Sequence, residues 1–191
     1  MKKLIATLMM MAGAYGALAQ GSVTFITFNA ANSASGTTFL NDGTTPAGAG
    51  IIGQLWWSTS SNGVYQVFDT GGSPQSFSGG YVNDGAAIIS SLLGGDAVWV
   101  QMRVWNASAG ATWEQAVPDI NNPTQNPLLQ FYGITASRSR TLGGINSDGD
   151  PVPPPSFNNF PNLNLTLVPE PSTMALAGLG LASLLIFRRR K

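Results

Sequence analysis

Apolar and polar positions divide the chain into two apolar ends and a middle in which short apolar runs alternate with turns. The middle, residues 20–167, contains runs rich in β-branched and aromatic residues, separated by Gly, Asn, Asp, Ser and Pro. Such short runs with two-residue alternation predict β-strands. The clearest of them cover residues 22–29, 51–58, 64–69, 97–106 and 163–168.

The run from Ala97 to Asn106 is the strongest strand pattern. Successive side chains of a strand point to opposite faces. The residues expected on one face are Val98, Val100, Met102 and Val104, and those expected on the other are Trp99, Gln101, Arg103 and Trp105.

A helix is expected at only one place in the middle. Residues 85–93, with the sequence GAAIISSLL, predict a short helix or helical turn. Many strands without alternating helices favour an all-β fold, an antiparallel β-sandwich of jelly-roll-like arrangement. Residues 121–161 contain seven prolines, so we expect a surface excursion there, with edge pairing possible around residues 128–135, because proline cannot donate to a sheet ladder.

The N-terminal apolar run has the three parts of a secretory signal peptide. Lys2 and Lys3 precede an apolar stretch, and Ala17 and Ala19 occupy the small-x-small positions before a cleavage point. This order predicts that residues 1–19 form a signal helix, removed after Ala19. A buried N-terminal helix is the alternative.

The C-terminal apolar run, residues 172–187, lies between a proline-rich collar and a cationic end. The collar is Val168, Pro169, Glu170 and Pro171, and the cationic end is Arg188, Arg189, Arg190 and Lys191. A helix of this length reaches about 24 Å, slightly less than the ~30 Å hydrocarbon core, and local thinning can close the gap. We therefore expect a transmembrane helix, with the cations in the cytoplasm and the domain on the far side of the inner membrane.

The order of Pro-Glu-Pro, apolar segment and terminal arginines resembles the PEP-CTERM sorting signal, whose usual form residues 168–173 follow closely. The resemblance implies processing by exosortase, a membrane-embedded, cysteine transpeptidase-like enzyme, with cleavage near Pro169–Pro171. The precursor would be anchored in the inner membrane, and its product would reach the cell surface or extracellular matrix. A simple single-pass anchor is the alternative.

The same resemblance extends into the middle of the chain. Residues 20–25, 48–56 and 100–106 are similar to a small β domain found among exported PEP-CTERM proteins. This similarity supports the expected fold and implies no activity.

The composition of the middle removes most catalytic chemistry. The chain has no Cys and no His, so disulfides, Cys/His zinc sites and His-based triads are excluded. Between Gln20 and Val168 the sequence contains three arginines, no lysine and eight aspartates or glutamates. This excess of negative charge argues against nucleic acid as a partner. We expect no cofactor and no enzymatic activity. Glu114 and Asp119 are the nearest pair for glycoside hydrolysis, recommended only by proximity.

Two further motifs have a functional and a structural interpretation. Residues 48–53 fit the G-x-G-x-x-G pattern of dinucleotide sites, but a strand pattern follows instead of a helix, which favours a turn. Asn146, Asp148 and Asp150 are a weak calcium candidate, because their spacing resembles a calcium loop that lacks its bidentate glutamate. A polar turn is the alternative.

Trp56 and Trp57 are adjacent, so on a regular strand they point to opposite faces. One of them should be exposed or covered by a loop. An exposed ring suits stacking on sugars, which makes extracellular polysaccharide a possible partner. The two resulting hypotheses are a structural surface protein and, as the alternative, a carbohydrate-binding module.

Overall fold

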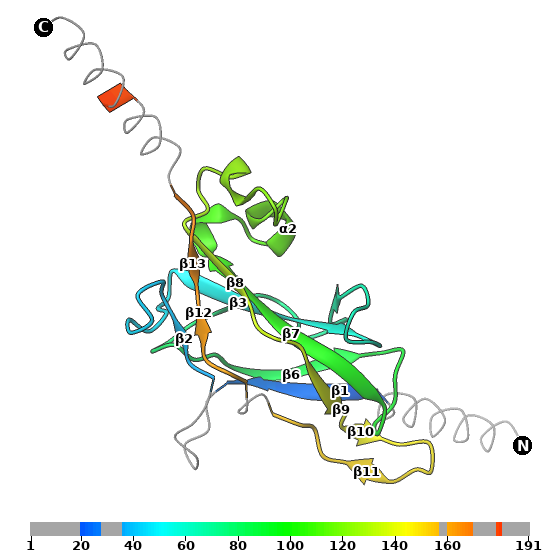
Figure 1. Cartoon of the computed structure of the whole chain (residues 1–191). Helices are drawn as coiled ribbons and strands as arrows, with labels where there is room; N and C mark the ends of the chain where they lie inside the picture. The colour runs from blue at the N-terminus through cyan, green and yellow to red at the C-terminus, as the bar shows by residue number, and fades with distance from the viewer. Residues whose placement is uncertain (1–19, 28–35, 157–159, 170–178, 181–191) are drawn as a thin grey trace, which may run out of the picture.

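The structure, a computed structural model, describes residues 20–27, 36–156, 160–169 and 179–180 (Figure 1). The predicted signal peptide with Ala17 and Ala19 lies outside these residues, as do Glu170, Pro171 and the cationic end, residues 188–191. Within the part of the chain that is described, no helix combines the length and the apolar character needed to cross a membrane. The transmembrane helix over residues 172–187 stays a prediction.

Seven strands form the largest sheet, in the order β13-β8-β7-β3-β4, with β5 also paired to β3 and β9 also paired to β7. They are β3 (Ile51–Ser58), β4 (Gln66–Val67), β5 (Gln75–Ser76), β7 (Ala97–Asn106), β8 (Phe131–Ile134), β9 (Arg138–Thr141) and β13 (Thr166–Leu167). β3 and β7 have the predicted bounds and pair antiparallel, from Ile51 opposite Asn106 to Ser58 opposite Trp99.

The remaining strands form three small sheets. β1 (Gly21–Ile26) pairs antiparallel with β6 (Asn83–Ile89). β10 (Gly144–Ile145) and β11 (Pro151–Val152) form a hairpin, and β2 (Thr38–Phe39) pairs in parallel with β12 (Leu163–Asn164). The predicted all-β class with antiparallel sheets is therefore confirmed, whereas the jelly-roll-like arrangement stays a prediction.

The main core lies between the large sheet and the β1–β6 pair. The predicted inward face of β7 is confirmed, because Val98, Val100, Met102 and Val104 are each at most 2% exposed. Apolar side chains from both sheets surround them, among them Val23, Phe25, Leu55, Trp57, Ala87 and Ile89. Removing this apolar surface from water is the main force that holds the two sheets together.

The predicted helix at residues 85–93 is wrong, because β6 occupies most of this segment. Ala87 and Ile89 are fully buried in the main core, which is the two-residue period of a strand. A short apolar run fits a buried strand or a helical turn equally well, and the pairing of β6 with β1 decides between them.

Part of the proline-rich region, residues 121–161, belongs to the large sheet. β8 lies between β7 and β13, and β9 also pairs with β7. The physical reason is that the prolines fall outside residues 128–150, so every backbone N–H needed for these two ladders is present. The remainder supplies loops and the β10–β11 hairpin.

A separate segment, residues 107–130, covers the part of the outer face of β3 and β7 that carries Trp56 and Trp105, and we call it the cap segment. It contains three short helices: η1 (Ala107–Ala109), α2 (Trp113–Ala116) and η2 (Pro123–Gln125). The Thr112 hydroxyl caps α2 by accepting from the Gln115 N–H. Figure 1 shows α2 at the end of the domain where β13 ends.

Two glycines with positive φ, one after β4 and one after β5, separate the effect of backbone strain from that of a steric clash. Gly71 has φ +68° and Gly79 has φ +58°. A Cβ at Gly71 would meet the backbone carbonyl of Ala86, whereas one at Gly79 would meet nothing within 4 Å. We expect Gly79→Ala to lower the free energy of unfolding by about 1 kcal/mol, through backbone strain alone.

Gly71→Ala adds a clash to the same strain, so we expect a loss of about 2 kcal/mol or more. Urea unfolding followed by far-UV circular dichroism measures both variants. Equal losses in the two variants would show that the close approach of Gly71 to β6 does not contribute.

Candidate sorting site at the end of the large sheet

The chain stays in the fold up to Val168 and leaves it at Pro169. Leu165 is 2% exposed, Val168 is 5% exposed, and Pro169 is exposed. The Val168 N–H donates to the Gln130 carbonyl over 2.8 Å, which continues the pairing of β13 with β8. The first residue of the predicted sorting motif is therefore part of the sheet.

The Val168 side chain packs into a second core beneath the cap segment. This core consists of Trp56, Trp105, Ala109, Trp113, Ala116, Val117, Leu129 and Val168. Trp105 is fully buried, at 0% exposure. Its ring packs edge to face on that of Trp113, with 5.8 Å between the ring centroids. Its Nε1–H donates to the Gly110 carbonyl over 2.9 Å.

Asn106, the last residue of β7, connects the central strand to the segment that holds Val168. Its Nδ2 donates to the Leu128 carbonyl over 2.8 Å. Its Oδ1 accepts from the N–H groups of Gln130, over 2.7 Å, and Phe131, over 3.0 Å. Because Gln130 in turn accepts from Val168, one buried amide fixes the path of the chain into the sorting motif.

A second asparagine holds the cap segment in shape. The Asn126 Nδ2 lies 2.9–3.1 Å from three backbone carbonyls, those of Ala109, Gln115 and Ala116. The Asn126 Oδ1 accepts from the N–H of Leu128. The cap segment has little regular structure, so these side-chain bonds satisfy backbone groups that a helix or sheet would otherwise pair.

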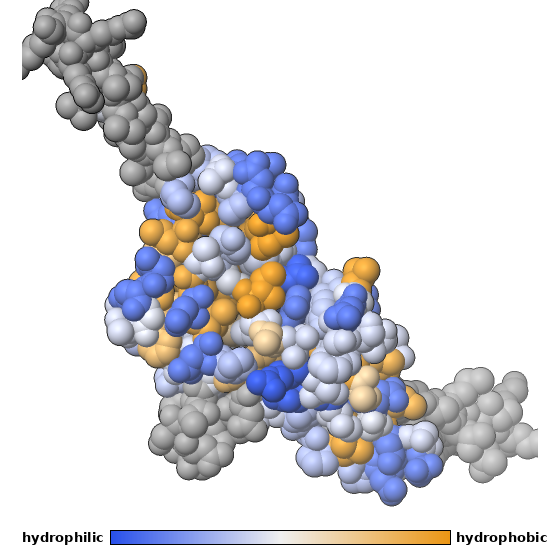
Figure 2. All heavy atoms as spheres, in the orientation of Figure 1, coloured by the Kyte–Doolittle hydropathy of each residue, from blue (hydrophilic) through white to orange (hydrophobic). Residues whose placement is uncertain are grey.

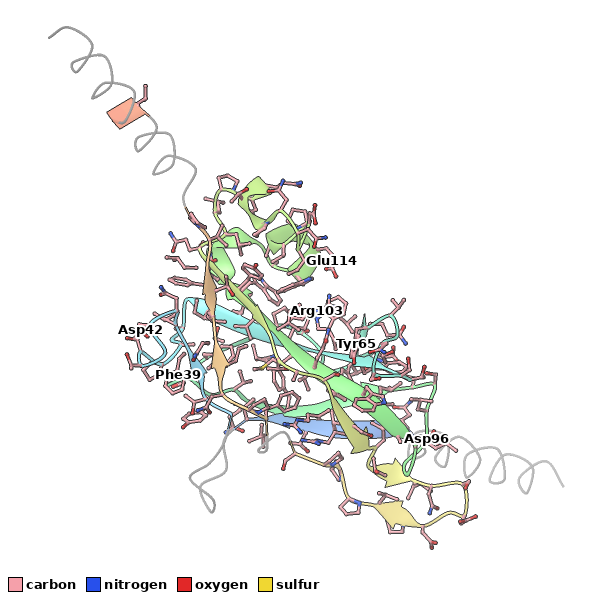
Figure 3. The ribbon with its side chains drawn as sticks, viewed as in Figure 1. Phe39, Asp42, Tyr65, Asp96, Arg103 and Glu114 are labelled. Carbon is pink, nitrogen blue, oxygen red and sulfur yellow. The ribbon has the colours of Figure 1, made fainter. Side chains whose placement is uncertain are left out.

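Arg103 lies between the cap segment and the large sheet. Its guanidinium carbon is 3.7 Å from the centroid of the Trp56 ring and 5.4 Å from that of Trp113. Figure 3 shows Arg103 between Glu114 and Tyr65. Burial lowers the pKa of Arg103, and the negative charge of the Glu114 carboxylate acts against that shift. This arrangement attaches the cap segment through cation–π contact and charge.

Trp56 and Trp57 are both buried, at 6% and 5% exposure. Trp57 packs in the main core and Trp56 in the second core, so the expectation that they point to opposite faces is met. The cap segment and Arg103 cover Trp56, which corresponds to the loop-covered alternative. Neither tryptophan presents an exposed ring for stacking on a sugar.

The weak calcium candidate forms a polar turn between β10 and β11. The Asn146 Oδ1 accepts from the N–H groups of Asp148, over 3.0 Å, and Asp150, over 2.7 Å. That oxygen is thus occupied by the backbone. Across the described ranges, no group of three or more His, Cys, Asp or Glu side chains could hold a metal ion.

The other sequence candidates also have structural partners. Residues 48–53 form a turn into β3, closed by the bond from the Ile51 N–H to the Gly48 carbonyl. The Asp119 Oδ1 accepts from the Asn121 N–H. Glu114 lies in the first turn of α2. Asp42, which is not one of these candidates, accepts from Thr45 and Thr44 through its carboxylate, and these hydrogen bonds lower its pKa to about 2.

Sequence reasoning missed that the fold and the sorting motif share a residue. The strand pattern over residues 163–168 contained the signal, because it ended on Val168. No pattern in the sequence indicates the contacts of Val168 with Gln130 and with the second core.

Comparison with known proteins locates one family in the chain. The PEP-CTERM protein-sorting motif matches residues 167–191. None of the curated proteins and none of the solved structures matches the chain. The motif indicates an exported protein that is sorted by exosortase from a membrane-anchored precursor. The chain is therefore a PEP-CTERM domain-containing protein whose motif begins on the last residues of its β fold.

Proposed function

We propose that this protein is a non-catalytic, structural component of the cell surface or extracellular matrix, delivered by cleavage near Pro169–Pro171. The observation that carries the proposal is that Val168 is buried at 5% exposure while Pro169 is exposed. Every described residue of the two cores lies at or before Val168, so cleavage near Pro169–Pro171 removes none of them. The product keeps its folded domain without the apolar tail.

The polar groups of the domain support a structural role. The Asp69 and Asp96 carboxylates accept from the N–H groups of Ser90 and Leu93, respectively, which stabilises loops. Arg103 stacks on a tryptophan. These side chains therefore serve to hold the fold together. The chain also contains no His or Cys to act as a base or nucleophile.

Polysaccharide binding by Trp56 and Trp57 is not part of the proposal. Stacking on a sugar needs an accessible ring face, and these two rings lie in the two cores. Exposing the Trp56 ring would require both the cap segment and the Arg103 guanidinium to move away from it. The structural role therefore has the stronger support.

Intact-mass spectrometry of surface material from the producing cell tests the proposed route. We expect a species that begins at Gln20 and ends near Pro169–Pro171, because the signal peptide and the apolar tail are both removed. Replacing Glu170 by Ala provides the matched variant, and we expect it to leave uncleaved precursor in the membrane fraction. Surface material that still contains Lys191 would instead favour a permanent single-pass anchor.

A further inference from the structure

The distance between the fold and the anchoring tail is short. Val168 is held by its bond to Gln130, and the apolar stretch begins at Ser172. Four residue steps span at most about 14 Å, even when the chain is fully extended. Each polar headgroup layer of a bilayer is about 5–7 Å thick. In an anchored precursor, the end of the domain must therefore lie at or near the membrane surface.

This end of the domain exposes large apolar side chains. Leu128 is 58% exposed, Leu167 is 49% exposed and Ile120 is 43% exposed. Leu167 belongs to β13, and Leu128 lies two residues from the Gln130 carbonyl that holds Val168. Figure 2 shows apolar residues at the end of the domain where the chain leaves the fold. We call Ile120, Leu128 and Leu167 the exit surface.

The surroundings of the exit surface are almost uncharged. Residues 117–130, with the sequence VPDINNPTQNPLLQ, carry Asp119 as their only charged side chain. Charged groups are costly to bring into the low dielectric of a bilayer, whereas asparagine, glutamine and proline are less so. The segment that carries Ile120 and Leu128 thus has the composition that close contact with a bilayer requires.

We propose that the exit surface rests on the lipid bilayer in the precursor, with Leu128 and its apolar neighbours entering the headgroup region. This inference rests on the proposed anchoring of the tail at residues 172–187. Moving apolar side chains from water to the boundary between headgroups and acyl chains lowers the free energy. The contact orients the domain, and it places Pro169–Pro171 at the membrane surface, where a membrane-embedded enzyme can reach it.

Site-directed spin labelling of the full chain in lipid vesicles tests this contact. The chain has no cysteine, so each single-cysteine variant carries one label. The variants are Leu128→Cys and Ile120→Cys in the exit surface, Ser147→Cys in the β10–β11 turn as the exposed control, and Leu179→Cys in the tail. Vesicles of phosphatidylcholine and phosphatidylglycerol are prepared so dilute in protein that most hold a single chain.

We expect a water-soluble nickel chelate to reach the labels at 128 and 120 about fivefold less than the label at 147, because lipid headgroups shield them. Figure 1 shows the β10–β11 turn at the opposite end of the domain from the exit of the chain. A label at 128 as accessible as that at 147, together with a shielded label at 179, overturns the inference and leaves the anchored precursor intact.

Two further results would each overturn the membrane contact for a different physical reason. An accessible label at 179 means that the tail is not inserted, and the proposed anchor itself fails. Shielding of the label at 128 only in protein-dense vesicles means that a second copy of the chain, rather than lipid, covers the exit surface.

Discussion

Trp105→Ala is expected to lower the free energy of unfolding by about 3–5 kcal/mol, the usual cost of removing a large buried aromatic side chain. Trp105 is 0% exposed, so the substitution leaves a cavity between β7 and the cap segment. It also removes the edge-to-face contact with Trp113 and leaves the Gly110 carbonyl without its donor. The loss is a large part of the roughly 5–15 kcal/mol that stabilises an ordinary domain.

Trp99→Ala is the matched control for this prediction. Trp99 lies on the same strand and the same face as Trp105, but it is only half-buried, so its replacement should cost distinctly less. Urea unfolding followed by far-UV circular dichroism measures both variants, because it does not depend on tryptophan fluorescence. Similar losses for Trp99→Ala and Trp105→Ala would mean that full burial of Trp105 in the second core adds no stability beyond that of a half-buried ring on the same strand.

The two longest strands, β3 and β7, could be predicted from the sequence. The physical reason is that each is paired with other strands along both of its edges. β3 and β7 pair with each other over eight residues each, and the alternation of Val98, Val100, Met102 and Val104 follows directly from one buried face. A long strand in the middle of a sheet shows its period more clearly than a two-residue strand at its edge. β4, expected over residues 64–69, contains only Gln66 and Val67.

The cap segment could not be predicted in the same way. Residues 107–130 have neither the period of a strand nor that of a helix, and side-chain amides such as Asn126 satisfy their backbone. Which residues these amides bond is decided by tertiary contacts. The sequence therefore left open whether Trp56 was exposed, and the cap segment settles that question by covering it.

The sorting motif could be predicted because short linear signals depend on residue order alone. The match over residues 167–191 confirms it. Its attachment to the fold depends instead on contacts between distant residues, such as Val168 with Gln130. The sequence placed the boundary between the domain and the sorting signal after residue 167. That boundary separates β13 from Val168, the residue that completes its packing.

Asn106→Ala tests how this attachment is maintained. Asn106 is 4% exposed, and its loss leaves the Leu128 carbonyl and the N–H groups of Gln130 and Phe131 without partners. An unsatisfied buried polar group costs about 1–3 kcal/mol. Some of the three groups can reach water after local rearrangement, so we expect a total loss of about 3–5 kcal/mol. Asn62→Ala, at an exposed position, is the control and should change stability little.

Amide hydrogen exchange distinguishes a local from a global effect of Asn106→Ala. If Asn106 fixes the path of the chain into the sorting motif, the amides of Gln130, Phe131 and Val168 lose protection well before those of β3, because Val168 depends on Gln130 and Gln130 on Asn106. Asn106→Asp keeps the acceptor oxygen and should retain part of the protection at Gln130 and Phe131. Uniform loss of protection across β3 and β13 would contradict this dependence. It would mean that the last strand and the motif it carries are held by the fold as a whole.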